Sequence, residues 1–220
     1  TLSTYSQTGG SFTGASMTVD SFTQTSGSTS LTGDLTVNTD YSQTGDGTVT
    51  VDGNTSITDT SGGMMLGNLD TTGTTTLLSR AGAIEQTIGT KLISDGAATI
   101  TASDGQPEPS YFDITLFNKD NDFKGTVTAS GKDVKIYDAN DLDSTITASG
   151  NAEIETGGIL STVLAVTGDS TLTSGGNLTI SGTSKDLTTN SGGTTSFGET
   201  TLAGKLDATG KDSITQTGKL

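Results

Sequence analysis

A short phrase, Ser/Thr-Gln-Thr with an apolar residue two positions before the glutamine, recurs along the chain. Its copies centre on Gln7, Gln24 and Gln43, on a looser match at Gln86, and on Gln216. The first three glutamines lie 17 and 19 residues apart, and the next interval of 43 residues is close to two such steps. A phrase that returns about every 20 residues indicates a stack of similar coils, each burying its apolar face against the next.

Between the phrases, short segments alternate aliphatic and hydroxyl residues and are bounded by Gly, Asn or Asp. Strict alternation places the aliphatic side chains on one face of a strand and Thr on the other. We interpret the Gly-Asp, Gly-Gly, Gly-Asn and Asp-Gly pairs as corners at which a positive φ is needed. The alternating segments are Ser16–Val19, Leu35–Val37, Thr48–Val51, Ala98–Thr101, Thr126–Thr128, Thr145–Thr147, Thr171–Thr173 and Leu178–Ile180.

The pattern predicts an all-β fold, a parallel β-helix (β-solenoid) with about 20 residues per coil. At about 4.8 Å per coil, about 11 coils would extend on the order of 50 Å. Some dipeptides also suit hairpin turns, so an antiparallel sandwich is an alternative. Residues expected to point into the core are Val127, Val134, Ile136, Ile146, Ile154, Val163, Leu172, Leu178 and Ile180.

Composition limits the kind of core that the chain can form. Only 29% of the residues are hydrophobic, while 47 Thr, 26 Ser and 31 Gly make up nearly half of the chain. Low hydrophobicity and a net charge of −15 favour disorder, but β-branched Thr favours strands and only two prolines are present. We therefore expect a thin core to which every coil contributes two or three apolar residues.

Charge and residue content exclude several classes of function. Seven Asp precede Arg80, the first basic residue, and the net charge of −15 disfavours nucleic-acid binding. The absence of Cys excludes disulfides and thiolate sites. The sequence contains no apolar run near 18 residues, so no membrane-spanning helix is predicted. Because residues 1–220 begin and end within a repeat phrase, we expect a single continuous solenoid segment of a longer chain.

One stretch departs from the repeat. Residues 104–110 contain both prolines, which cannot donate to a strand ladder, so a loop that leaves the stack is predicted there. The most apolar run of the chain, 111–117, follows directly. Two interpretations remain open for this run: aromatic packing beneath the loop, or a local recognition patch.

Residues 121–127 (NDFKGTV) and 138–142 (DANDL) form a pattern that resembles the large filamentous-haemagglutinin-like proteins of Gram-negative bacteria. The phrases at 176–180 and 214–220 are also similar to that family, and the resemblance covers about residues 111–220. It implies a right-handed parallel β-helix that is exported through a partner pore in the outer membrane. Members serve as adhesins, matrix components or stalks. The family's N-terminal secretion domain has no match here.

Clustered oxygen-bearing side chains raise the question of a calcium site. In the run from Asp120 through Asn121 and Asp122, Lys124 stands where a ligand oxygen would be needed, and no Glu follows at the right distance. The cluster at 138–143 is similar, with Asn140 expected to stack in a ladder or cap a corner. We interpret both clusters as turn-capping residues and predict no metal and no cofactor.

Catalysis has little support in the sequence. The chain has no His or Cys for a standard nucleophile–base arrangement, and Arg80 is its only arginine. Polysaccharide-acting β-helix enzymes use clustered carboxylates with Lys or Arg. Glu153 and Glu155 alternate on one strand without an obvious partner and are interpreted as a solvated face. No catalytic residue is predicted, and the chain is not expected to be an enzyme.

Recurrent Thr-x-Thr pairs raise an ice-binding alternative, because an array of Thr hydroxyl and methyl groups can order water. The pairs begin at Thr48, Thr99, Thr126, Thr145 and Thr171, at intervals of 51, 27, 19 and 26 residues. Ice binding needs long ranks in register on one flat face. The uneven intervals suggest that the ranks are interrupted.

We therefore expect a structural segment of an extracellular fibrous surface protein, an adhesin or a filament or biofilm-matrix scaffold, at the cell surface of a Gram-negative bacterium. Expected partners are further repeats of the same chain or other copies stacked end to end, the secretion pore during export, and surface glycans or proteins of host or neighbouring cells. Ice binding is the alternative, and a polysaccharide-acting enzyme is a more distant one.

Overall fold

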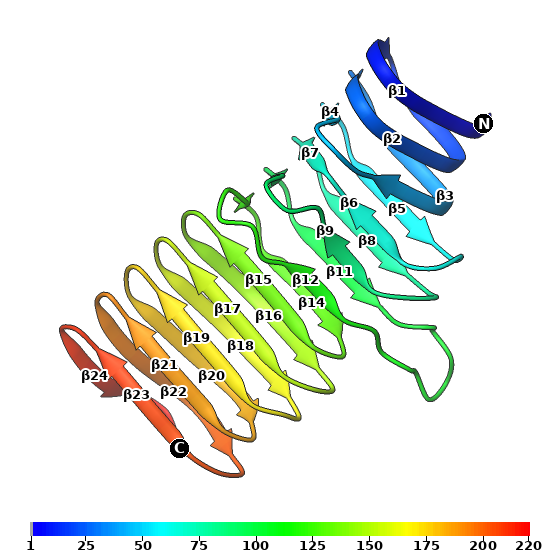
Figure 1. Ribbon diagram of the computed structural model, residues 1–220. Helices are drawn as coiled ribbons and strands as arrows, with labels where there is room; N and C mark the ends of the chain where they lie inside the picture. Colours follow the sequence, from blue (N-terminus) through cyan, green and yellow to red (C-terminus); the bar gives the residue numbers. More distant parts are fainter. Residues whose placement is uncertain (1) are drawn as a thin grey trace.

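A computed structural model describes residues 2–220 as a stack of parallel β-coils (Figure 1). Within that range 24 strands join in one sheet that winds around a common axis, and the two termini lie at opposite ends of the stack. The stack is a β-solenoid of about 12 turns of roughly 18 residues, which confirms the predicted fold class. The right hand of the helix stays a prediction of the resemblance.

Three sides make up the coils. The first turns consist of long strands that run around corners: β1 (Leu2–Gly14), β2 (Met17–Leu31) and β3 (Leu35–Gln43). We call the side that leads from β3 into β5 the first side. It runs through β5 (Thr55–Asp59), β8 (Thr75–Ser79), β11 (Ala98–Ala102), β14 (Val127–Gly131), β16 (Leu142–Ala148), β18 (Leu160–Val166), β20 (Leu178–Ser184), β22 (Thr194–Leu202) and β24 (Ser213–Gln216).

The second side continues from β3 through β6 (Met64–Leu66), β9 (Ile84–Gln86), β12 (Ile114–Leu116), β15 (Val134–Asp138), β17 (Ala152–Thr156), β19 (Ser170–Ser174), β21 (Leu187–Ser191) and β23 (Leu206–Gly210). The third side continues from β2 through β4 (Thr48–Val51), β7 (Asn68–Thr71), β10 (Leu92–Ser94) and β13 (Asp122–Phe123), where it ends. Beyond it each coil is shorter: Leu142 pairs with Leu160, and Leu160 with Leu178, at 18-residue steps.

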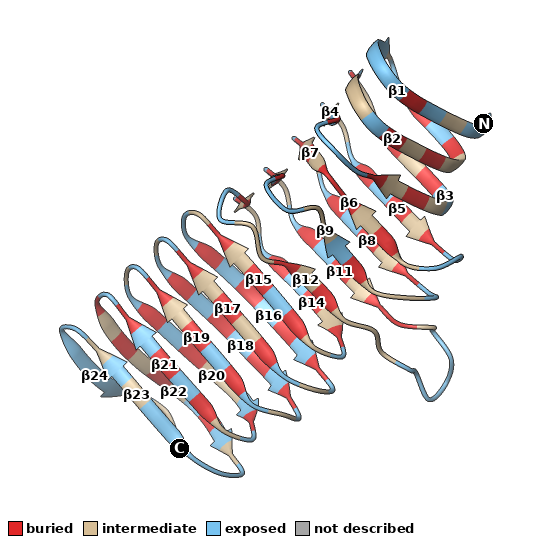
Figure 2. Cartoon of the chain, viewed as in Figure 1, coloured by how far each residue is buried: buried red, intermediate tan, exposed pale blue. Residues whose placement is uncertain are grey.

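The core is a set of aliphatic columns along the axis. Burial alternates along each strand, as the red and pale bands of Figure 2 show. On the first side, Ile100 pairs with Ala129 and Ala129 with Ile146, all of them buried. Every coil therefore adds a few apolar side chains to a core that is continuous along the stack, so a chain that is 29% hydrophobic still buries a large apolar surface.

The predicted core is correct except at Val163, which is 48% exposed, while Leu164 is 3% exposed. In β18 the buried positions are Leu160, Thr162, Leu164 and Val166. Because alternation along a strand has a period of two, these residues fix Val163 on the outside. Thr162 lies inside, and its Oγ1 accepts a hydrogen bond from Ser144 Oγ at 3.0 Å, so a hydroxyl residue that resembles a surface residue in the sequence belongs to the core.

The predicted loop is present. Residues 104–110 contain no strand and protrude from the otherwise regular stack (Figure 1). Asp104 Oδ1 accepts hydrogen bonds from the N–H groups of Gln106 and Ser110, both at 3.1 Å, and an antiparallel bridge joins Ser103 to Tyr111 at its base. The chain then rejoins the second side at β12, so the coil step from Ala98 to Val127 lengthens to 29 residues.

None of the described residues forms a helix of the length and apolarity needed to cross a bilayer.

Candidate functional site on the corners and sides of the solenoid

Asp and Asn side chains at the corners tie each coil to the next. Asp133 Oδ1 accepts a hydrogen bond from the backbone N–H of Asn151 at 2.7 Å. Asn151 Oδ1 in turn accepts one from the N–H of Asp169 at 2.9 Å. The same contact recurs in the pairs Ser16–Asp34, Asp34–Asn54, Asn54–Thr74, Asp141–Ile159, Asn177–Thr194 and Asp186–Lys205. We call this repeated contact the corner ladder.

At several corners, a glycine before the ladder residue makes room for this ladder. A Cβ at Gly150 would collide with Asp133 Oδ1, and one at Gly168 would collide with Asn151 Oδ1. Neither glycine has a positive φ, which among the described glycines is confined to residues 10, 27, 45, 63, 89, 105 and 182. The prediction that the Gly-Asp and Gly-Asn corners need a positive φ is therefore wrong at these positions, since the requirement is space for the neighbouring coil's side chain.

The recurrent glutamines form a buried amide ladder at the N-terminal end. Gln24 Nε2 donates to Gln7 Oε1 at 2.8 Å, and Gln43 Nε2 donates to Gln24 Oε1 at 3.0 Å. The apolar residues of the same phrases stack as rings, with centroids 5.0 Å apart for Tyr5–Phe22 and 5.1 Å apart for Phe22–Tyr41. The repeated phrase is thus a repeated inter-coil contact.

The later copies of the phrase behave differently. Gln86 follows in the same column after one coil in which Leu66 replaces the glutamine, so the 43-residue interval does span two coils. Gln216 lies on another side: it pairs with Phe197 on the first side and is exposed, with Gly218 O as its side-chain partner at 2.9 Å. The final phrase therefore resembles the first ones in sequence without being their structural equivalent.

Asn121, which was considered as a calcium ligand, makes hydrogen bonds within the protein instead. Asn121 is fully buried, and its Oδ1 accepts hydrogen bonds from Gln86 Nε2 at 2.7 Å and from the N–H of Leu92 at 2.9 Å. Its Nδ2 donates to Gln86 Oε1 at 3.0 Å and to Leu116 O at 3.2 Å. Across the described chain, no group of three or more His, Cys, Asp or Glu is arranged to hold a metal ion.

Asp138, in the second cluster, is a buried corner carboxylate. Its Oδ2 accepts a hydrogen bond from the N–H of Phe123 at 2.6 Å, and its Oδ1 accepts one from the N–H of Asn140 at 2.7 Å. Burial raises the pKa of Asp138 above the usual aspartate value, and the two N–H groups oppose this rise. The turn-capping interpretation is confirmed for Asp138 and for Asp141, which belongs to the corner ladder.

The second-side carboxylates have a partner that sequence reasoning missed. Lys135 Nζ lies 2.6 Å from Glu153 Oε2, because β15 pairs with β17 and places the two residues side by side. Both side chains are about half exposed, so the pair contributes little stability. The interpretation of Glu153 as a residue without a partner is wrong. The signal available in the sequence was the 18-residue spacing of Lys135 and Glu153 in a chain with that coil length.

The outward threonines form one long rank in register on the first side. Thr99 pairs with Thr128, and Thr128 with Thr145. The rank extends toward the N-terminus through Thr18, Thr36, Ser56 and Thr76, and ends at the exposed Val163. The uneven sequence intervals do not interrupt this rank, because corners of different length absorb the extra residues.

The remaining threonine pairs do not extend this rank. Thr48 lies on the third side and Thr171 on the second. A second outward row lies on the first side, two residues further along each strand. This row contains Leu78 and Ala165 among its threonines. A single continuous rank, rather than a broad flat array, is therefore what the fold presents.

The apolar run after the loop serves packing in part. Phe112 packs against the core, and Ile114 and Leu116 are buried within it. Phe117 is half-buried and makes an edge-to-face contact with Tyr137 of the next coil, with ring centroids 6.0 Å apart. Aromatic packing thus accounts for most of the run, while Phe117 and Tyr137 remain partly exposed on the second side.

A family model described as repeats of unknown function (DUF5649) matches three consecutive stretches, residues 56–130, 131–184 and 184–220. The middle stretch begins at Gly131. Gly131 pairs with Ala148, and Ala148 pairs with Val166, which lies one coil before Ser184. The middle match therefore spans three coils. No curated protein and no solved structure matches the chain.

Proposed function

We propose that the chain, which belongs to the DUF5649 family of repeats of unknown function, is a structural segment of an extracellular fibrous surface protein, an adhesin or filament scaffold of a Gram-negative bacterium. The observation that carries the proposal is the uninterrupted stack. Backbone pairing, aliphatic columns and the corner ladder all run along one axis. Such a stack resists bending because every bend would break contacts between successive coils.

A mechanical role fits the distribution of polar groups. The carboxylates with the most hydrogen bonds, such as Asp59 and Asp138, receive backbone N–H groups at corners. Side chains that a catalytic role would need exposed are thus used to close turns. In this proposal the segment provides length and stiffness, and the end coils pair with further repeats of the same chain or with other copies.

The experiment compares bacterial cells that carry the gene with cells from which it has been deleted. Surface attachment is measured, and the cell surface is imaged by electron microscopy. Loss of attachment together with loss of thin surface fibres is the expected result. Fibres and attachment that persist unchanged in the deletion strain would overturn the proposed role.

Ice binding is a second candidate function, favoured by the single rank from Thr18 to Thr145. Purified protein would be tested for thermal hysteresis and for altered ice-crystal shape. In this alternative, Thr99→Tyr in the middle of the rank abolishes the effect, whereas Thr171→Tyr on the second side leaves it unchanged. Ice crystals of ordinary shape with the unaltered protein would remove this candidate.

A further inference from the structure

The third side of the solenoid ends at β13, and this leaves a strand edge in the middle of the stack. β13 pairs with β10 along one edge, and no strand of the described chain pairs with it along the other. The remaining two sides continue past this point, because β12 pairs with β15 and β14 pairs with β16. The stack therefore narrows from three sides to two at a single coil.

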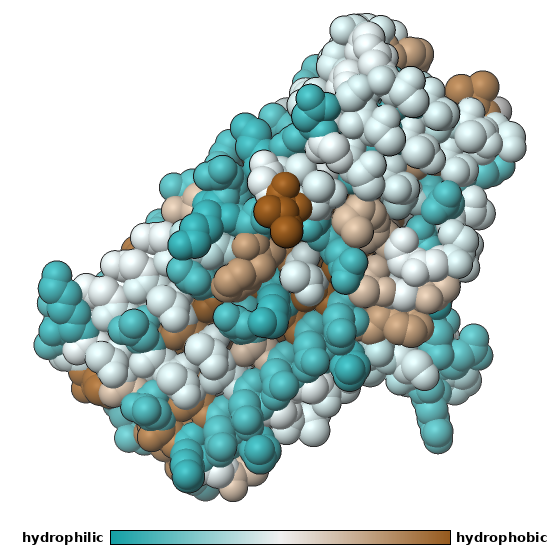
Figure 3. Space-filling view, viewed as in Figure 1, coloured by the Kyte–Doolittle hydropathy of each residue, from teal (hydrophilic) through white to brown (hydrophobic). Residues whose placement is uncertain are grey.

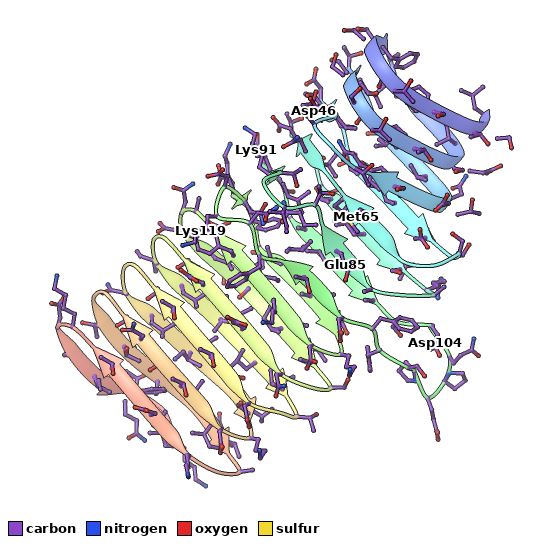
Figure 4. The ribbon with its side chains drawn as sticks, viewed as in Figure 1. Asp46, Met65, Glu85, Lys91, Asp104 and Lys119 are labelled. Atoms are coloured by element: carbon purple, nitrogen blue, oxygen red, sulfur yellow. The ribbon has the colours of Figure 1, made fainter. Side chains whose placement is uncertain are left out.

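The corners of the chain mark the extent of the third side in Figure 4. Asp46, Lys91 and Lys119 lie in the corners before β4, β10 and β13, and their labels follow one edge of the stack. Beyond Lys119, short corners at 139–141, 157–159 and 175–177 join the second side directly to the first. These corners lie where further strands of the third side would run.

A hollow of about 450 Å³ lies beside the edge of β13. Asp122 and Lys124 line it from the third side, and residues 139–141 and 157–158 line it from the corners of the next two coils. The hollow therefore occupies the position of the missing strand, and space is available there for an extended segment of another chain.

The surrounding surface offers few apolar contacts to such a segment. Figure 3 shows a face that is mostly hydrophilic or neutral, with scattered hydrophobic residues. An incoming strand would depend on unpaired backbone groups, which are the main contacts in strand addition to a sheet edge. The backbone groups along the open edge of β13 thus decide whether a strand can be added.

These backbone groups are already bonded within the chain. Alternate residues of a strand direct their backbone groups to opposite neighbours, and the N–H of Lys124 donates to Ser94 O at 2.9 Å, toward β10. Asn121 and Phe123 therefore face the open edge. Asn121 O accepts the N–H of Ala139 at 2.7 Å, and the N–H of Phe123 donates to Asp138 Oδ2 at 2.6 Å.

Asp138 differs from the residues that follow it in the same column. Asp138 pairs with Thr156, Thr156 with Ser174, and Ser174 with Ser191, and all four side chains are buried. Each of the three hydroxyl groups donates to the carbonyl two residues further on, within its own corner. The carboxylate thus stands at the one position of this column that adjoins the edge of β13.

A carboxylate suits this position because it has two acceptor oxygens. Asp138 Oδ2 accepts the N–H of Phe123 in the previous coil, and Oδ1 accepts the N–H of Asn140 in its own corner, at 2.7 Å. One side chain thereby closes the corner and also satisfies the backbone donor that the missing strand would otherwise satisfy.

We propose that Asp138 is an edge cap. Its carboxylate takes the place of the strand that would follow β13, ends the third side, and keeps this edge from pairing with an extended segment of a second copy of the chain. A second copy is the relevant partner because it carries strands, such as β10, whose spacing already matches that of β13. This inference does not depend on the proposed extracellular role.

Hydrogen exchange at the Phe123 amide tests the cap. Asp138→Ser introduces the residue that the column carries at Ser174 and Ser191, so the corner itself should be kept. Because the shorter side chain no longer reaches the Phe123 N–H, exchange at this amide, measured by NMR, should become faster by about tenfold or more. The exchange rate is expressed relative to that of the Val134 amide on the second side, which corrects for a change in global stability.

Two further variants serve as controls in the same measurement. Asp138→Asn keeps an acceptor oxygen and should restore most of the slow exchange. Thr156→Ala changes the next position of the column, where no strand edge lies, and should leave the relative exchange rate of Phe123 unchanged. An exchange rate in Asp138→Ser equal to that of the natural chain would overturn the edge cap.

Sedimentation velocity tests whether the cap excludes a second copy. All variants share the same end coils, so any end-to-end association is common to them. Asp138→Ser should show additional association that increases with concentration, whereas Asp138→Asn and Thr156→Ala should sediment like the natural chain. If Asp138→Ser also sediments like the natural chain, the inferred exclusion of a second copy is overturned.

Discussion

The identity of a corner residue is explained by its contacts with the neighbouring coil. Gly150 has no side chain because Asp133 of the previous coil fills that space, and Asp133 is an aspartate because its oxygen accepts the N–H of Asn151. Each corner pair thus satisfies a backbone donor that would otherwise lack a partner within the chain. The dipeptides Gly150-Asn151 and Gly168-Asp169 have glycine for this reason, rather than for a special backbone conformation.

Substituting Gly150 with Ala should destabilise the fold by about 1–3 kcal/mol, because the added methyl group displaces Asp133 from its hydrogen bond. Gly62→Ala is the control, since a Cβ there meets open space and the backbone φ is ordinary. Urea denaturation of both variants checks this. Equal midpoints would contradict the role assigned to the corner glycine.

Asp138 should make stability depend on pH. Its raised pKa means that the folded state holds the proton more tightly than the unfolded state, so its contribution is fully present below the unfolded-state pKa of about 3.9. That contribution is lost as the pH rises through the raised folded-state value. The stability difference between the natural chain and Asp138→Asn should therefore be larger near pH 4 than near pH 7.

Ser174→Ala is the matched control for Asp138. Ser174 is buried in the same corner column, two coils further on, and its hydroxyl donates to Gly176 O at 2.9 Å. It carries no titratable group, so its effect on melting temperature should not change with pH. If the loss of stability in Asp138→Asn is also independent of pH, the raised pKa assigned to Asp138 is refuted.

At the scale of the element, pairing with the neighbouring coils decides which residues face inward. β18 contains two adjacent aliphatic residues, Val163 and Leu164, and local sequence does not distinguish them. Pairing of Ile146 with Leu164 settles the choice, because the column on the first side continues through that position. The same pairing sets Thr145 beside Val163 on the outside.

Substitutions at these two adjacent positions test the register. Leu164→Asp buries a charge in the core column and should lower the melting temperature severely or prevent folding. Val163→Asp places the same charge in solvent and should be close to neutral. A comparable loss of stability in both variants, measured by circular dichroism, would show that the register is wrong.

The amide ladder is likewise a property of stacked elements. Gln24→Leu should destabilise the protein by about 1–3 kcal/mol, because it leaves buried amide groups of the neighbouring glutamines with fewer partners. Gln216→Leu changes the same phrase where the side chain is exposed, and it should have almost no effect. Thermal melting of the two variants compares them, and similar losses would contradict the different placement of these copies.

At the scale of the whole molecule, the loop at 104–110 interrupts the series of strands along the chain, but the pairing between coils continues past it. β11 pairs with β8 before it and with β14 after it, and β9 pairs with β12 across the loop. The two parts of the chain are therefore joined by parallel pairing as well as by the covalent connection.

Cleavage in this loop should leave the rod intact. A protease site that replaces residues 106–109 would be cut readily because these residues are exposed. The two fragments should remain together in gel filtration and separate only in denaturant. Fragments that separate under native conditions would show that the stack is less continuous than its pairing indicates.

The sequence alone determined the stack of parallel coils, the loop at 104–110 and nearly all of the core, because alternation and repeated phrases are local signals that each coil carries for itself. Only the tertiary structure decided how the coils align. Corners of unequal length shift the register, so sequence intervals could not reveal the rank through Thr99 or the different position of Gln216.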